Sequence, residues 1–273
     1  MSTNPDNEKF NNILNQLKQK NEKRRLNIWI PSLSRGVEFK HLTIEQQKRL
    51  IKSSLRENLL KLDFSRNIYD IIVENNTAPD VDVTKLNVID MISIGLTYRA
   101  TDIDENYGFY YNQDFFPVDL NKVCEKIRTI DMSKLKSTTI VSDNYHLHIN
   151  VPTIQVDKIM NDELYLKYKD IPDDAEMAKE MLTDLYMYEA AKYVKQVDII
   201  SEGDNPDEPP VIVDFSNFTA AQRLQAIAEI PLDMLNKLVS LSEIVQETEN
   251  KILEVELSEN QTAKIEINSA FFT

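Results

Sequence analysis

A shortage of glycine constrains this sequence more than any other feature. The 273 residues include only four glycines, Gly36, Gly95, Gly108 and Gly203, whereas average usage of about 7% would give roughly 19. Phosphate-binding loops and sharp catalytic turns depend on glycine, because glycine adopts positive φ and lets another backbone approach closely. The sequence contains no dinucleotide fingerprint, no Walker loop and no G-x-S-x-G turn. We therefore expect an interaction or structural protein and not an enzyme, with no catalytic residues.

Potential metal and redox ligands are also scarce. Three histidines and one cysteine are too few for a structural zinc site, a disulfide framework or an iron–sulfur cluster. Cys124 has apolar neighbours, which favours a place in the core over a role as a nucleophile. His146 and His148 would share one strand face, but His41 is far away in sequence, so an exposed polar face is the simpler interpretation. We predict no metal and no cofactor.

The segment TDIDENYG is weakly similar to a calcium-binding loop. Oxygen ligands occur at Asp102, Asp104 and Asn106, but the glycine, Gly108, comes one position late, and Gln113 stands where the loop needs a bidentate Glu. We interpret this segment as a solvated acidic turn. The aromatic residues that follow in YGFYYNQDFF are equally consistent with interface anchors and with core packing.

Charge is distributed unevenly along the chain. The formal net charge is -14 and the isoelectric point is near 4.8, which argues against binding to nucleic acid. Residues 1–66 contain 14 Lys and Arg against 7 Asp and Glu, whereas residues 67–273 contain 17 against 38. A basic head and an acidic body suit oriented docking, either on copies of the same chain or on a partner. Ordinary solvated faces are an equally good explanation.

The N-terminal segment, residues 1–25, predicts an extension outside the main core. It has no apolar signal region, and the longest apolar-rich stretch, VIDMISIGL, is too short to cross a bilayer. We therefore expect no membrane insertion and folding in a cytoplasm. Within this segment an apolar stripe at i, i+3, i+4 and i+7 predicts a short helix that docks on the body or on a partner. The stripe consists of Phe10, Ile13, Leu14 and Leu17.

The fold predicted for the rest of the chain is α+β, with a helical core and short antiparallel hairpins near 27–40, 137–151 and 252–268. Gly36 is expected to take positive φ in the first hairpin. Thr43 and Gln46 form a capping box that starts a helix, with Ile44, Ile51, Leu55, Leu59 and Leu62 as its buried stripe. Further helices are expected around 65–75, from Thr84, from Asp119, around 155–165, around 176–192, from Thr219 and from Pro231. In the last of these, Leu232, Leu235, Leu238, Val239 and Val245 form the stripe.

We divide the chain into an extension at 1–25, a main α+β domain at 26–200, an acidic loop at 201–210 and a C-terminal helix-plus-hairpin subdomain at 211–273. Two further sets of residues are candidates for binding partners, besides the N-terminal stripe. The first is a basic helix face, Lys48, Arg49, Lys52 and Arg56. The second is the pair of terminal aromatics, Phe271 and Phe272, for which we favour an intramolecular pocket between the last hairpin and the helix from Pro231, with a neighbouring subunit as the alternative.

Several segments, taken in order, resemble the baseplate hub and hub-assembly proteins of T-even-type bacteriophages. The stretch LNIWIPSLSRGVEFKHLTIEQQKRLIKS is similar to the opening of that family, and VIDMISIGLTYRA is similar to its apolar helix. The segments VDLNKVCEKI, HINVP, IPLDMLNKLV and IEINSAFFT follow in the family's order. The similarity covers about residues 26–152 and 190–273 and includes no catalytic motif.

This resemblance implies a viral structural protein of the tail baseplate hub, assembled in the host bacterial cytoplasm and acting through contacts with other hub proteins or with itself. The alternative is a non-virion assembly factor that assists the hub and then leaves. A carboxylate-based hydrolase is a distant third, because no acid/base pair can be named from the sequence.

Overall fold

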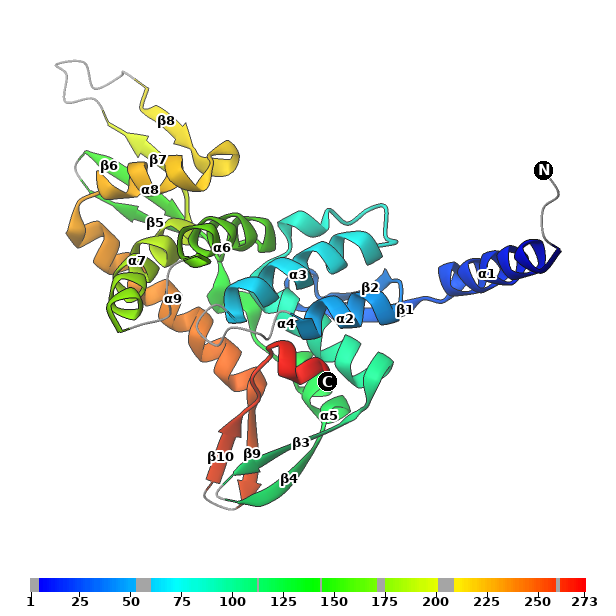
Figure 1. Ribbon diagram of the computed structural model, residues 1–273. Coiled ribbons are helices and arrows are strands. Elements are labelled where there is room, and N and C mark those ends of the chain that lie inside the picture. Colours follow the sequence, from blue (N-terminus) through cyan, green and yellow to red (C-terminus); the bar gives the residue numbers. More distant parts are fainter. Residues whose placement is uncertain are drawn as a thin grey trace.

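The computed structural model describes residues 5–52, 60–111, 113–142, 144–170, 175–200, 209–258 and 261–273. It combines helices with several small antiparallel sheets (Figure 1), which confirms the predicted α+β class. The helices are α1 (Pro5–Lys23), α2 (Ile44–Lys52), α3 (Leu60–Asn75), α4 (Val88–Tyr98), α5 (Leu120–Ile127), α6 (Ile154–Tyr168), α7 (Ala175–Tyr193), α8 (Ala220–Ala228) and α9 (Leu232–Leu253). The strands are β1 (Leu26–Ile30), β2 (Arg35–Phe39), β3 (Asn106–Tyr111), β4 (Asp114–Asp119), β5 (Thr138–Val141), β6 (Tyr145–Ile149), β7 (Val194–Ile199), β8 (Val211–Asp214), β9 (Glu254–Ser258) and β10 (Gln261–Lys264).

The strands form three separate hairpins and one four-stranded sheet. The hairpins are β1–β2, β3–β4 and β9–β10, and the sheet has the order β5-β6-β7-β8. All three predicted hairpins are present, whereas β3–β4 was not predicted from its sequence. Strands β7 and β8 pair with each other, with Val197 opposite Val213. The predicted boundary at 201–210 therefore falls between two paired strands of one sheet, although residues 201–208 themselves lie outside the described part.

The turn of the first hairpin differs from the prediction. The positive φ belongs to Ser34, at 50°, and not to Gly36. Ser34 ends a short 3₁₀ turn over Pro31–Leu33 and donates its N–H to the carbonyl oxygen of Pro31 at 3.1 Å. Gly36 serves a different purpose, because a Cβ there would overlap the side-chain amide of Asn27 on the paired strand.

Helix α4 is the central helix, and it begins later than predicted. Asn87 caps it, accepting hydrogen bonds from the N–H groups of Ile89 and Asp90, while Thr84 lies in a short 3₁₀ turn capped by Asp82. The Asp90 carboxylate completes a capping box with the Asn87 N–H at 2.9 Å. It also accepts from the hydroxyl of Ser32 at 2.6 Å, so one buried carboxylate joins the first hairpin to α4.

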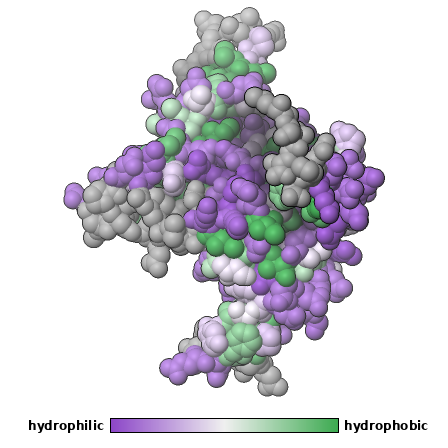
Figure 2. Space-filling view, turned by 45° about the vertical axis from the view of Figure 1, so that its right-hand side comes forward, coloured by the Kyte–Doolittle hydropathy of each residue, from purple (hydrophilic) through white to green (hydrophobic). Residues whose placement is uncertain are grey.

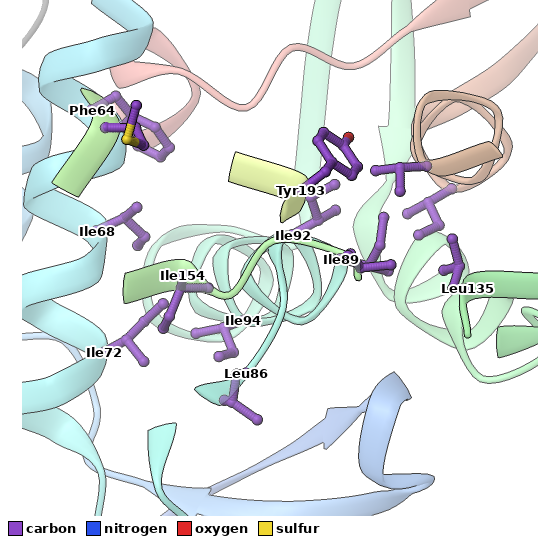
Figure 3. Close-up of a cluster of buried hydrophobic side chains, with 14 of the residues drawn as sticks. Phe64, Ile68, Ile72, Leu86, Ile89, Ile92, Ile94, Leu135, Ile154 and Tyr193 are labelled. Carbon is purple, nitrogen blue, oxygen red and sulfur yellow. The ribbon is translucent and has the colours of Figure 1, made fainter. Parts of the chain in front are cut away.

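Apolar side chains from α3, α4 and α6 form the centre of the core (Figure 3). Ile68 of α3, Ile94 of α4 and Ile154 of α6 meet there, each at most 1% exposed. Two predicted core residues are in fact exposed, Ile44 at 74% and Leu232 at 67%. Both are the first residue of their helix, and at that end the helix is not covered by the body.

The stripe predicted for one helix from Ile44 to Leu62 is divided between two helices. Leu62 is buried in α3, and Ile51 is half-buried in α2. The predictions for Leu55 and Leu59 lie outside the described residues. The capping box predicted at Thr43 is present at the start of α2, and Asp119 and Thr219, from which helices were expected, cap α5 and α8.

A buried polar cluster ties α3, α6 and α7 together. Asp157 of α6 accepts hydrogen bonds from the Ser65 hydroxyl at 2.6 Å and from the Asn161 amide at 2.8 Å. Its other oxygen lies 2.8 Å from Nζ of Lys192, which also binds Glu189. Burial alone would lower the pKa of Lys192, but the negative charges of Asp157 and Glu189 outweigh it and raise that pKa. The ammonium group is therefore held in its charged form.

Candidate interaction surfaces

The clearest candidate surface is the apolar stripe of α1. Phe10, Ile13, Leu14 and Leu17 are 36–59% exposed, so the described part of the chain does not cover them. Figure 1 shows α1 projecting from the body, to which Arg24 and Arg25 connect it. Most helical stability in proteins comes from packing of an amphipathic face against other groups. The exposed stripe is thus a candidate contact surface.

Lysines border the α1 stripe on both sides. Each residue turns an α-helix by about 100°, so Lys18 lies beside the stripe on one side, and Lys9 and Lys20 lie on the other. All three side chains are exposed. The stripe is therefore an apolar surface with a basic border.

The predicted basic face of α2 is only partly available. Lys48 and Lys52 are exposed, but Arg49 donates from Nη1 to Oε1 of Glu74 at 2.9 Å. The hydrogen bond from Arg49 lowers the pKa of Glu74, which keeps this pair charged on both sides. Arg56 lies outside the described residues.

The terminal aromatics are not a partner surface. Phe271 and Phe272 are 1% and 0% exposed, so the structure buries them within the chain. Phe271 packs on Tyr107 of β3 with ring centroids 5.0 Å apart, and Phe272 packs on Phe64 of α3 at 5.6 Å. The main neighbours of this tail are α2, α3, β3 and the end of α4, whereas we expected the last hairpin and α9. Phe271 and Phe272 are therefore core residues and not candidates for binding a partner.

The aromatic segment YGFYYNQDFF forms the hairpin β3–β4, which has both half-buried and exposed rings. Tyr107 is half-buried against Phe271, whereas Tyr110 and Phe115 are 77% and 57% exposed. These two exposed rings pair across the strands at 5.4 Å. A Cβ at Gly108 would overlap the ring of Phe115, which explains the glycine at that position.

Several of the carboxylates and histidines singled out in the sequence bind neighbouring protein groups. Asp102 accepts hydrogen bonds from the backbone N–H of Leu42 at 2.7 Å and contacts His41 Nδ1 at 2.5 Å. Nε2 of His148 lies 2.7 Å from Oδ2 of Asp198. Among the described residues, no three His, Cys, Asp or Glu side chains gather as a metal site requires.

A cavity of about 370 Å³ adjoins the cluster around Lys192. Its walls combine apolar side chains with Asp157, Asn161 and Lys192. These three polar groups bond to the buried cluster described above, and Glu189, Glu249, Lys264 and Glu266 also line the cavity.

A surface that the sequence did not predict lies between the four-stranded sheet and the corner where α8 meets α9. Here a cavity of about 130 Å³ has an apolar lining. We call it the α8–α9 groove, and its residues are Tyr145, Leu147, Val197, Ile199, Val213, Phe215, Ala226, Ile230, Pro231 and Met234. The alternation of apolar residues in β6 and β7 indicated that one sheet face is buried. It did not indicate that α8 and α9 would leave part of that face uncovered.

Exposed apolar residues extend this groove to the surface. Val211 pairs with Ile199 on the lined face of the sheet, and Leu232 directly follows Pro231. Ile199, Val211 and Leu232 are 39%, 58% and 67% exposed. Figure 2 shows hydrophobic side chains gathered at the upper end of the molecule, at the height of β7 and β8 in Figure 1.

No family model matches this chain, and no curated protein or solved structure is significantly similar to it. None of the helices in the described ranges combines the length and apolar character that a membrane span requires.

Proposed function

We propose that this chain is a structural or assembly protein that acts through protein–protein contacts, and that it belongs to the tail baseplate hub of a T-even-type bacteriophage. The observation that supports the contact function is the exposed, lysine-bordered stripe of α1 on a helix that projects from the body. The phage assignment is supported by the ordered sequence segments, from LNIWIPSL near the start to NSAFFT at the end. In this proposal the protein is no enzyme, and its place is the virion tail, after assembly in the host cytoplasm.

Deletion of residues 1–25 tests the contact function. Because α1 is exposed on its apolar side, the truncated chain is expected to melt within a few degrees of the full chain and to lose assembly with its partners. Melting is followed by circular dichroism, and assembly by sedimentation of the hub from infected cells. If the truncated chain unfolds, α1 stabilises its own body and is not a docking element.

A non-virion assembly factor is the second form of the same proposal. Mass spectrometry of purified virions separates the two forms, since a hub component remains in the particle and an assembly factor does not. If the intact chain never associates with hub proteins, the proposed function is wrong in both forms.

A further inference from the structure

We infer that α1 of one copy docks in the α8–α9 groove of a second copy, so that copies join head to tail. This inference rests on the proposed function, because it names the partner of the α1 stripe. Four observations support it: the shape and polarity of the groove, its charge, the dimensions of the stripe and the tether of α1.

The groove has the polarity that the stripe needs. Its floor is apolar and well covered, with Leu147 and Phe215 at most 1% exposed. Its mouth carries Ile199, Val211 and Leu232, each more than a third exposed. Exposed apolar residues that adjoin one another around a hollow are typical of a docking site, whereas single exposed apolar residues are common on any protein surface.

The charge near the groove is opposite to that of α1. Glu229 and Asp233 directly flank the α8–α9 corner in the chain, and both are exposed. These two carboxylates give the mouth of the groove an acidic edge. They complement the lysines that border the α1 stripe.

The stripe has the spacing of a helix that lies in a groove. From Phe10 to Leu17 it rises about 10 Å along α1, at 1.5 Å per residue. One side of a two-turn segment thus presents all four apolar side chains, with Lys18 and Lys20 beside them. This is the helix-in-groove mode of recognition, with anchors at i, i+3, i+4 and i+7.

The short connection between α1 and β1 means that α1 docks in the groove of another copy and not in its own. Only Arg24 and Arg25 connect α1 to β1, and two residues span at most about 7 Å. Figure 1 places α1 and the sheet β5-β6-β7-β8 at opposite ends of the body. Docking within one chain is excluded by this tether, whereas docking between copies uses two different surfaces. Such a heterologous contact builds a ring or an open chain of subunits.

The test is sedimentation velocity of the full chain and of three single variants. Leu17→Glu places a charge in the stripe, and Leu232→Glu places one at the groove mouth. Ile44→Glu is the matched control, because Ile44 is also an exposed apolar residue at the first position of a helix. We expect the first two variants to weaken self-association about tenfold or more and the control to associate as the original chain does.

Mixing the two defective variants identifies the geometry. The Leu17→Glu chain keeps an intact groove and the Leu232→Glu chain keeps an intact α1, so an equimolar mixture is expected to form a dimer and nothing longer. If both variants associate normally, or if their mixture stays monomeric, the inference is wrong. The same holds if the original chain is monomeric at every concentration.

These results are separable from those for the proposed function. A chain that never self-associates, but loses hub assembly when residues 1–25 are removed, contradicts the inference and leaves the proposed function intact. In that case a hub protein of another sequence occupies the α1 stripe. Circular dichroism of each variant shows that the fold is retained, which the exposure of Leu17, at 53%, leads us to expect.

Discussion

Arg99 donates a hydrogen bond from Nε to the backbone carbonyl oxygen of Phe271 at 2.7 Å. Arg99 is buried just after α4, in a π-helical turn over Arg99–Ile103. Burial lowers the pKa of its guanidinium below the ordinary value. On the other side of the tail, Nε2 of Gln47 donates to the carbonyl oxygen of Phe272 at 3.0 Å. The last residues of the chain are thus bonded to α2 and to the end of the central helix.

Replacement of the terminal aromatics is expected to destabilise the isolated protein. Phe271→Ala and Phe272→Ala each remove a fully buried ring, a change that costs about 3–5 kcal/mol in a core. Their rings touch at 5.3 Å, so the double variant should lose less than the sum. Urea denaturation measures this loss. Phe115→Ala, at a 57% exposed position, is the control, and an unchanged midpoint for the terminal variants would show that the tail does not hold the fold.

Self-association is expected to weaken as salt is added. The contact joins a basic α1 to an acidic body, and such attraction is screened over about 8–10 Å at 0.1–0.15 M salt. Sedimentation at low and high ionic strength measures the effect. Association that strengthens with salt would mean that apolar burial alone governs the contact.

The buried carboxylate of Asp90 should make stability depend on pH. Burial raises the pKa of Asp90 above its ordinary value, although hydrogen bonds from Ser32 and Asn87 act against this rise. The folded state therefore holds the proton more tightly than the unfolded state does. The stabilising contribution of this group is complete below the unfolded pKa, near 3.9, and is lost as pH rises through the folded pKa.

Asp90→Asn isolates that contribution. The amide cannot titrate, and its NH₂ group faces donors, so the variant should be less stable than the original chain at about pH 4. The difference in unfolding free energy between the two chains should shrink as pH rises, because ionisation of buried Asp90 then destabilises the original chain alone. Urea midpoints measured across pH check this, and a deficit that grows with pH would contradict the direction of the pKa shift.

Removing Lys192 alone should lower the unfolding free energy more than replacing Lys192 and Asp157 together. Lys192→Met leaves the buried carboxylate of Asp157 without its cation, a change that costs about 3–5 kcal/mol. Combining it with Asp157→Asn removes the uncompensated charge, so the double variant should recover part of the lost stability. A double-mutant cycle by urea denaturation measures the coupling. A loss in the double variant equal to the sum of the two single losses would show that the charges do not interact.

Short-range signals in the sequence determined much of the secondary structure. Thr43 with Gln46, and Thr219 with Gln222, specify helix starts, because each hydroxyl bonds a backbone N–H only three residues away. The hairpins near 27–40, 137–151 and 252–268 follow from alternation over a few residues. The exposure of the α1 stripe also follows from sequence, since its Asn- and Lys-rich surroundings supply no apolar cover.

Long-range packing decided the remaining features, because they depend on which distant segments meet. Nothing near Phe272 in the sequence indicates that Phe64 lies beside it in space. Likewise, the α8–α9 groove exists only because β8 pairs with β7 while α8 and α9 leave part of that sheet face uncovered. The amino-acid pattern states that a side chain is apolar, but whether it is buried, as Phe272 is, or exposed, as Leu232 is, depends on the area that other elements cover.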